Sequence, residues 1–238
     1  MRAPMDFSFY SKSYDEHVRG LEASGDSAME RAVGSSDHSD FLSFGALMRQ
    51  VLQQAGLQSG DYLIDAGCGS GRLAYALSAW LKGRYLGTDI VKKLIDHARF
   101  LCNRPDWRFQ LVDKIRIPER DGKADMVCFF SIFTHLLHED SYLYLLEANR
   151  VLKPGGRAVF SFLEFSIPSH WAVFHAMLRD RSAGAHTHHN QFLSRDIIEH
   201  WLPALGFSLV AFQDGDKPCH GIDSEANLGQ SVCVLQKQ

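Results

Sequence analysis

In this 238-residue chain, residues 62–77 read YLIDAGCGSGRLAYAL and carry the clearest structural pattern. A short apolar run leads into three glycines at alternate positions, and apolar residues at helical spacing follow them. This order predicts a strand, a glycine turn and a helix. Because Gly67, Gly69 and Gly71 carry no side chains, the backbone can approach a ligand closely there, with the N–H groups of the helix nearby. We therefore expect a polar ligand at the turn.

Strand patterns and helix patterns alternate along most of the chain. The expected strands cover residues 62–67, 83–89, 107–113, 125–133, 157–162, 207–213 and 230–236. The run DMVCFFSIF at 125–133 is continuously apolar, as in a central strand buried on both faces. KPGG at 153–156 is expected to stop a helix and turn the chain before the next strand. The alternation predicts an α/β protein with a doubly wound, mainly parallel, seven-stranded sheet of the Rossmann-like kind.

The spacing of the glycines separates two kinds of nucleotide site. In a dinucleotide fingerprint the third glycine comes three residues after the second, whereas Gly71 comes only two after Gly69. This spacing argues against a pyrophosphate bound in the usual way. Asp89 ends the second expected strand, near the separation of about 20 residues from which an acidic side chain meets a ribose hydroxyl pair. We therefore expect Asp89 to bind a ribose without a pyrophosphate.

Charge and cysteine content exclude several classes of function. The net charge is −3 and no dense run of Lys or Arg occurs, so we expect no nucleic-acid partner. The five cysteines form an odd number without CxxC spacing, which favours a reducing compartment, and we expect a cytoplasmic protein. The longest apolar stretch is far too short to span a bilayer, so we expect no membrane association.

Five motifs in this order resemble the class I S-adenosylmethionine-dependent methyltransferases. They are YLIDAGCGSGRLA (62–74), the strand-ending Asp89, LVD (111–113), DMVCFFSIFTHL (125–136) and RVLKPGGRAVFSF (150–162). The resemblance covers residues 62–162 in register, and residues 191–238 look like the last helix and antiparallel strand pair of that family. It implies S-adenosyl-L-methionine as the cofactor, lying across the carboxyl ends of the strands.

The resemblance also implies a set of cofactor-binding residues. They are Asp65, Gly67 and Gly69 at the amino-acid moiety, Asp89 at the ribose, Ile90 and Asp113 at the adenine, and Phe130 and Ser131 beneath the methionine part. Cys68 and Gly71 belong to the same turn, with Cys68 as a small residue that fits there rather than a nucleophile. The alternative for Asp65 is to accept hydrogen bonds from loop N–H groups instead of a ligand.

We expect a single methyltransferase domain over residues 1–238, because this length and 45% hydrophobic residues can bury one sizeable core. Residues 38–163 form the expected cofactor-binding core, and residues 193–238 the closing helix and strand pair. Residues 1–37 and 164–192 fall outside the alternation. Ligands of open α/β sheets bind outside the carboxyl ends of the strands, so we assign these two segments to an N-terminal lid and a substrate-cover insertion.

The two covering segments supply further candidates. Relatives with a similar Tyr-rich start fold it over the cofactor, which implies Tyr14 at the cofactor and Tyr10 at the substrate; the alternative is a disordered arm. In the insertion, Trp171, His186 and His189 are substrate-binding candidates. The cluster HTHH (186–189) has no nearby carboxylate or cysteine, so we expect a lid loop there and no metal site.

His135 is the catalytic candidate. It follows the fourth expected strand, at the edge where the methyl group should point, and it can accept a proton from a substrate hydroxyl or ammonium. The alternative is a histidine that only caps or packs at a helix start. Because positioning supplies much of the acceleration of methyl transfer, a base is needed only for an acceptor whose proton has a high pKa. Oxygen and nitrogen acceptors therefore stay open.

The acceptor is expected to be a small molecule. FSIFT at 130–134 is not the Asn/Asp-Pro-Pro-aromatic turn of adenine-amino methyltransferases, and the Pro-Cys pair at 218–219 lies in the wrong place for cytosine-carbon chemistry. Phe162, Phe165, Trp171 and Phe174 form an aromatic cover that suggests a partly apolar acceptor. The alternatives are a nicotinamide-dependent oxidoreductase, a non-catalytic nucleoside-binding module and a protein methyltransferase.

Overall fold

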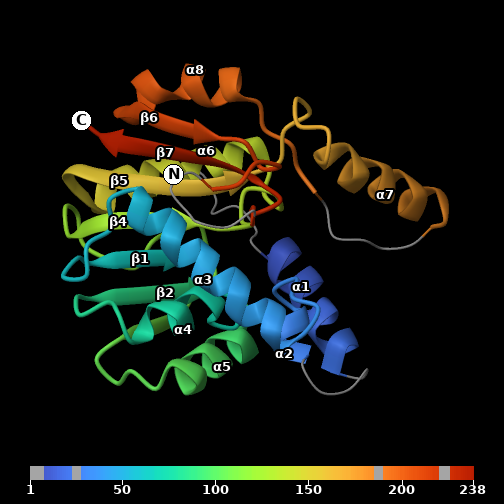
Figure 1. Ribbon diagram of the computed structural model, residues 1–238, viewed down its shortest axis with the longest axis horizontal. Coiled ribbons are helices and arrows are strands. Elements are labelled where there is room, and N and C mark those ends of the chain that lie inside the picture. The colour runs from blue at the N-terminus through green and yellow to red at the C-terminus, as the bar shows by residue number, and fades with distance from the viewer. Residues whose placement is uncertain (1–7, 23–27, 185–189, 220–225) are drawn as a thin grey trace. The chain divides into compact units, whose positions relative to one another are not determined.

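A computed structural model describes residues 8–22, 28–184, 190–219 and 226–238 (Figure 1). Its strands are β1 (Leu63–Ala66), β2 (Tyr85–Asp89), β3 (Arg108–Leu111), β4 (Ala124–Phe129), β5 (Leu152–Phe162), β6 (Phe207–Gln213) and β7 (Ser231–Lys237). They form a seven-stranded sheet in the order β3-β2-β1-β4-β5-β7-β6. The β5–β7 and β6–β7 pairs are antiparallel. This confirms the expected α/β fold with a mainly parallel sheet and an antiparallel last strand.

The chain divides into two compact units, residues 1–119 and 120–238. The first unit contains the helices α1 (Ser8–Glu22), α2 (Ala28–Arg31), α3 (His38–Gln54), α4 (Arg72–Ser78) and α5 (Lys92–Cys102). The second unit contains α6 (His138–Val151), α7 (His170–Ser182) and α8 (Arg195–Leu205). The expected organisation as one domain with its four segments stays a prediction.

In the first unit, β1, β2 and β3 are parallel neighbours. Every residue of β1 and β2 is buried, as their continuous apolar sequences predict. Leu63 lies opposite Tyr85, and Leu86 lies opposite Arg108. Because the strands run in one direction, the glycine turn after β1 and Asp89 at the end of β2 reach the same edge.

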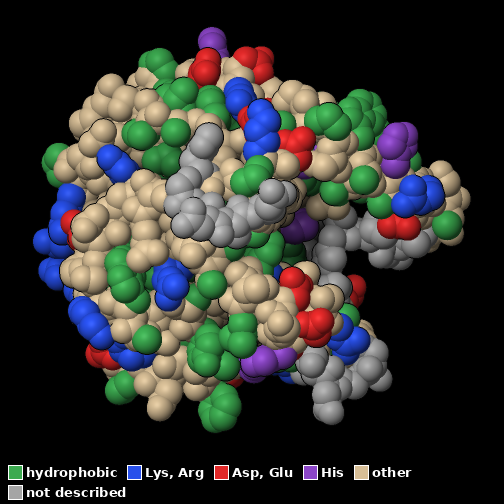
Figure 2. Space-filling model, viewed as in Figure 1, with side chains coloured by type: hydrophobic (Ala, Val, Ile, Leu, Met, Phe, Trp, Pro, Cys, Tyr) green, Lys and Arg blue, Asp and Glu red, His purple; other side chains and the backbone are tan. Residues whose placement is uncertain are grey.

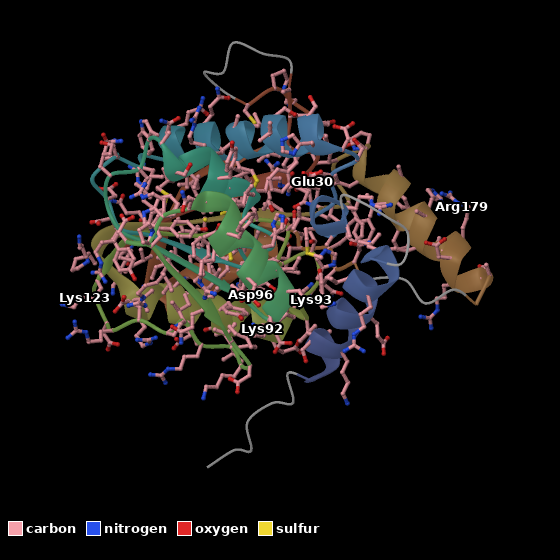
Figure 3. The ribbon with its side chains drawn as sticks, turned by 90° about the horizontal axis from the view of Figure 1, so that it is seen from below. Glu30, Lys92, Lys93, Asp96, Lys123 and Arg179 are labelled. Carbon is pink, nitrogen blue, oxygen red and sulfur yellow. The ribbon has the colours of Figure 1, made fainter. Side chains whose placement is uncertain are left out.

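Helix α3 is not predicted by the alternation of strands and helices. It begins after the N-cap residue Asp37, whose side chain accepts the N–H of the third helical residue at 2.9 Å. A Cβ on Gly45 would lie 2.6 Å from the carbonyl oxygen of Arg72, so α3 packs directly on α4. Glu30, labelled in Figure 3, joins α2 to the start of α3 through a 2.6 Å contact with Nδ1 of His38.

The solvent face of α5 carries a chain of ion pairs. Lys92 pairs with Asp96 one helical turn later (Figure 3). Arg99 lies 3.3 Å from the same carboxylate. Asp96 is about half exposed. Exposed pairs of this kind contribute little to stability, so Asp96 is available as a control position whose replacement should leave the fold intact.

In the second unit, α6 packs on β5 and α8 on β6, while α7 projects away from the strands (Figure 1). α7 forms in the expected insertion, and α8 begins after Ser194, as its sequence predicts. Among the helices that the structure describes, none is long and apolar enough to cross a lipid bilayer.

The start of β5 differs from the expected strand at 157–162. β5 begins at Leu152, directly after α6, and Leu152 lies opposite Ala124. The next registered pair joins Met126 to Arg157, so residues 153–156 bulge out of the strand. Gly155 has φ of 77°, a conformation that its missing side chain permits. KPGG therefore forms a bulge inside the strand instead of a turn before it.

The end of β4 also differs from the expected strand at 125–133. β4 ends at Phe129, because Ser131 has a left-handed φ of 58° and the N–H of His135 closes a turn on the carbonyl of Ile132 at 2.9 Å. The apolar run continues past the strand because Phe133 fills the core, stacked on Phe129 with ring centroids 4.9 Å apart. The last residues of the run at 125–133 are therefore apolar because they are buried, and not because they pair in the sheet.

Candidate functional site

The glycine turn adopts a backbone that side chains oppose. Gly67, Gly69 and Gly71 have φ of 81°, 55° and 94°, all in the left-handed region. The N–H groups of Gly67 and Cys68 both donate to the carbonyl of Thr88, at 2.8 and 2.9 Å. These bonds hold the turn against the end of β2, so its conformation is fixed by the sheet.

Two of the three glycines also lie against other parts of the first unit. A Cβ on Gly71 would lie 2.8 Å from Cα of Ala98, so this glycine allows α4 and α5 to approach each other. A Cβ on Gly69 would lie 2.5 Å from a methyl group of Val33. Close packing of α4 on α5 therefore requires glycine at position 71, while Gly69 lies beneath the N-terminal segment.

Asp89 joins the end of β2 to the glycine turn. Its Oδ2 accepts the N–H of Gly69 and its Oδ1 accepts the N–H of Val91, both at 2.9 Å. Burial raises the pKa of Asp89 to about 6, although these backbone bonds favour the ionised form. Each carboxylate oxygen can accept more than one hydrogen bond. Asp89 can therefore hold the turn and accept from a ligand at the same time.

Asp65 has a side-chain partner that the sequence does not predict. Its Oδ2 accepts the hydroxyl of Tyr85 at 2.7 Å, and both residues are buried. Tyr85 is held in turn by Trp107, with ring centroids 4.5 Å apart. Burial and the charge of Asp65 raise the pKa of the Tyr85 hydroxyl well above its usual value. The tyrosine therefore fixes the orientation of this carboxylate.

Helix α1 lies over the region that follows β2. Val18, Val91 and Leu94 form a small buried cluster, and Tyr14 and Ile90 pack against it. Burial and the nearby charge of Asp89 raise the pKa of the Tyr14 hydroxyl. The N-terminal segment thus contains helices, with Tyr14 beside Asp89.

The remaining candidates of the first unit differ in their exposure. Cys68 is buried, and burial raises the pKa of its thiol well above the usual value, as expected of a small packed residue. Asp113 is exposed in the bend after β3, and Tyr10 is half-buried in α1. The binding roles of these residues stay predictions.

Arg72, which the sequence reasoning does not single out, is a buried charge at the end of the turn. Its guanidinium donates to Oγ of Ser35 at 3.2 Å and lies over the ring of Phe44, 4.3 Å from the centroid. Burial lowers the pKa of Arg72 to about 10. A cation in the first turn of a helix interacts unfavourably with the helix dipole. The position of Arg72 directly after the glycine turn is therefore a sequence signal that could have identified it.

In the second unit, Ser131 is held in its left-handed conformation by two polar neighbours. Its N–H donates to Oγ of Ser161 at 2.7 Å, and Nε2 of Gln230 donates to its Oγ at 3.1 Å. The Ser161 hydroxyl donates to Oε1 of the same glutamine at 2.7 Å. Phe130, the preceding residue, is buried. A residue other than glycine with a left-handed backbone is often found in functional loops.

His135 lies in the turn between β4 and α6, three positions before the first residue of that helix. It is half-buried. The next contact along the turn joins the carbonyl of Thr134 to the N–H of Gln191 at 2.7 Å, so the end of the insertion lies on this turn. The proposed role of His135 as a base stays a prediction.

The insertion carries an exposed aromatic surface, formed by Phe165, Trp171, Phe174 and Phe192. Phe165 stacks on Phe192 with centroids 4.3 Å apart, and Phe174 meets Phe165 edge-on at 5.4 Å. Phe165 is 49% exposed and Trp171 is 44% exposed. Figure 2 shows hydrophobic side chains gathered over the beginning of α7.

One residue of the expected aromatic cover lies elsewhere, and two candidates of the insertion lie outside the described residues. Phe162 does not belong to the cover: this last residue of β5 is fully buried, and its ring packs against the rings of Phe160 and Phe212. Its assignment to the cover is wrong. His186 and His189, with the rest of HTHH, lie outside the described residues.

A buried carboxylate ties the two ends of the insertion together. Glu164 accepts from Arg195 at 2.8 Å and from the hydroxyl of Ser231 at 2.5 Å. Beside it, the N–H of Leu193 donates to the carbonyl of Leu163 at 2.8 Å. Arg195 also pairs with Asp214 at 2.5 Å. The insertion therefore leaves and rejoins the fold at one stem.

The chain matches a described family over the part that contains the glycine turn. Residues 64–160 match the family model of a methyltransferase domain. This range includes the whole of the turn, Asp89 and the strands from β2 to β4.

Two curated relatives are similar to this chain. The 27-O-demethylrifamycin SV methyltransferase of Amycolatopsis mediterranei is 30% identical over 118 residues, covering 48% of this chain and 43% of the relative. The malonyl-[acyl-carrier protein] O-methyltransferase of Serratia marcescens is 32% identical over 143 residues, covering 58% of this chain and 51% of the relative. The chain thus spans about half the length, or less, of the curated relatives that it matches.

A solved structure supports the fold over a longer range. The magnesium protoporphyrin IX methyltransferase of Synechocystis PCC 6803, crystallised with bound S-adenosylhomocysteine, is similar with a TM-score of 0.62 and 16% identity, covering 97% of both chains. At this identity the likeness shows the fold. The sheet order agrees with that fold, and residues 64–160, which contain the glycine turn and Asp89, are similar to the methyltransferase domain family.

Proposed function

We propose that this protein transfers a methyl group from S-adenosyl-L-methionine to an oxygen or nitrogen atom of a small-molecule acceptor. The observation that carries the proposal is the buried Asp89 carboxylate, which accepts the N–H of Gly69 in a methyltransferase-type glycine turn. Its spare lone pairs suit the two hydroxyls of a ribose. Ile90 and Tyr14 supply an apolar surface beside it, which suits the adenine.

The cofactor supplies an electrophilic methyl on its sulfonium, and transfer breaks that S–C bond while a new bond forms to the acceptor. The protein residues have simpler tasks: they bind the cofactor, orient the acceptor and remove its proton. We assign proton removal to His135, whose imidazole accepts the proton that an acceptor hydroxyl or ammonium loses. Ser131 and Phe130 are assigned to the methionine part.

We assign the acceptor to the exposed aromatic surface of the insertion. Four packed rings, two of them nearly half exposed, suit a partly apolar molecule. The relatives named above are a rifamycin methyltransferase and a malonyl-[acyl-carrier protein] O-methyltransferase, and both names favour an oxygen acceptor. A reducing compartment such as the cytoplasm is proposed because all five cysteines are free and buried.

The first test is calorimetric titration of the full chain with S-adenosylmethionine, S-adenosylhomocysteine and NADH. We expect micromolar binding of the first two, weakened at least about tenfold in Asp89→Ala. The matched control is Asp96→Ala, which removes an exposed carboxylate from the same unit and should leave the affinities unchanged. Binding of NADH alone would overturn the proposal in favour of an oxidoreductase.

The second test addresses catalysis. The protein is incubated with S-adenosylmethionine and a panel of apolar alcohols and amines, and the formation of S-adenosylhomocysteine is measured. We expect turnover with at least one hydroxylated acceptor, and a kcat that rises with increasing pH through a histidine pKa in the wild type but not in His135→Gln, because only the neutral imidazole can accept a proton. Tight cofactor binding without turnover for any acceptor would favour the non-catalytic module.

A further inference from the structure

The first unit contains a buried arginine whose charge is not paired with a carboxylate. Arg72 is 9% exposed. Its guanidinium donates to the neutral hydroxyl of Ser35, and among the described residues no carboxylate lies within ion-pair distance of it. Its Nε is buried and has no hydrogen-bond partner within that part of the chain. A buried guanidinium with unused donors is strongly unfavourable unless an anion joins it.

A second unpartnered polar atom lies in the same turn. Ser70 is completely buried, and its hydroxyl oxygen has no hydrogen-bond partner among the described residues. Native proteins leave few buried polar atoms unsatisfied, and such atoms indicate a ligand or water that completes them. Two of them, two positions apart in a glycine turn, therefore point to a polar group that binds there.

The charges around the turn indicate what this group is. In the described part of residues 1–119, the buried charged residues are Asp65, Arg72 and Asp89, and all three belong to the turn or to the adjoining strand end. The charge of Asp40 and, after it, the charge of Asp65 favour the charged form of Arg72, so the guanidinium lies in the field of both carboxylates without an ion pair to either. A neighbouring buried anion and cation are complementary to an amino-acid zwitterion, which presents an ammonium and a carboxylate.

We propose that Arg72 binds the α-carboxylate of the methionine part of the cofactor. This inference rests on the proposed function, because it concerns the same cofactor. The nucleoside part has no carboxylate, so the arginine contributes only to ligands that carry the amino-acid moiety. An arginine donates through up to five N–H groups and remains charged at neutral pH, which suits a planar carboxylate.

The experiment compares two ligands that differ in the amino-acid moiety. S-adenosylhomocysteine carries it, whereas 5′-methylthioadenosine has the same nucleoside and sulfur but lacks it. We expect Arg72→Met to weaken the binding of S-adenosylhomocysteine by about 10- to 100-fold and the binding of 5′-methylthioadenosine by less than about twofold. The effect of Arg72→Lys on the binding of S-adenosylhomocysteine should lie in between. A loss of equal size for both ligands would overturn the inference and make Arg72 a structural residue.

The matched control is Arg49→Met. Arg49 is a half-buried arginine of α3 that donates to the carbonyl of Ala76 in α4, so its loss disturbs the same helix pair away from the turn. The ratio of the two affinities should not change in this variant. If it changes as much as in Arg72→Met, the effect comes from helix packing and the inference fails.

A measurement on the wild type covers the case in which Arg72→Met does not fold. Decarboxylated S-adenosylmethionine keeps the amine and sulfonium but has no carboxylate, and we expect it to bind about 10- to 100-fold more weakly than S-adenosylmethionine. Equal affinity would overturn the inference. Binding of none of the adenosyl ligands by the wild type would instead overturn the proposed function itself.

Discussion

At the scale of single residues, Asp89 combines two opposed properties. Its carboxylate is buried, and its folded-state pKa of about 6 lies above the ordinary value of 3.8. The folded protein therefore binds this proton more tightly than the unfolded chain. The contribution of Asp89 to stability is greatest below pH 4 and falls as pH rises through the window from 3.8 to 6. A buried ionised group is kept here at the expense of stability, as at many ligand sites.

The Asp89→Asn variant tests this balance, because asparagine does not titrate. Relative to the wild type, the free energy of unfolding of the variant should rise by about 2 kcal/mol between pH 4.5 and 7.5, since the wild type alone loses stability in that window. Urea denaturation at the two pH values measures the difference. A pH-independent difference would mean that Asp89 has an ordinary pKa in the folded protein.

The sequence predicts the residues of the site better than it predicts their partners. Asp89 and the glycine turn follow from spacing along a continuous stretch. Arg72 does not stand out, because its neighbours Ser35 and Phe44 come from a segment that packs on the turn only in the folded chain. Ser131 is predicted as a site residue, but its left-handed backbone is not, since its partner Gln230 lies about a hundred positions away.

At the scale of elements, Gly69 and Gly71 of the glycine turn differ in what surrounds them. Gly71 combines a left-handed backbone with a 2.8 Å approach to the backbone of α5, which cannot move aside easily. Gly69 meets the side chain of Val33, which can rotate. The boundaries of strands are less predictable than the turn: β4 and β5 differ from expectation because burial of Phe133 and the bulge at 153–156 depend on packing across the sheet.

We therefore expect Gly71→Ala to destabilise the protein more than Gly69→Ala. Left-handed strain in alanine costs about 1 kcal/mol, and the clash with α5 adds about 1–3 kcal/mol. Gly122→Ala is the control for strain alone, because Gly122 has φ of 64° and open space around its Cα. Chemical denaturation of the three variants gives the order. Equal losses at Gly71 and Gly122 would contradict the packing explanation.

At the scale of the whole molecule, the five cysteines share the same environment. Cys68, Cys102, Cys128, Cys219 and Cys233 are all free and buried. Burial raises the pKa of Cys102 to about 12 and also raises the pKa of Cys68, Cys219 and Cys233. The thiolate is the reactive form, so these thiols should be inert in the folded protein.

Ellman's reagent tests this expectation on the whole chain. We expect no fast-reacting thiol in the native protein and five in denaturant, because reaction requires unfolding. Added S-adenosylhomocysteine should slow the residual reaction by stabilising the folded state. A single thiol that reacts within seconds in native buffer would show that one cysteine is accessible and would identify a candidate reactive residue.

The stem at Glu164 and Arg195 has a consequence for protein engineering. Because the insertion enters and leaves the fold at this buried ion pair, its length and composition can change while β5 and α8 keep their places. Under the proposed function, a segment from a related methyltransferase, grafted between these two residues, should exchange one acceptor preference for another. Cofactor recognition, encoded about a hundred residues earlier in the chain, would be inherited unchanged by every such chimera.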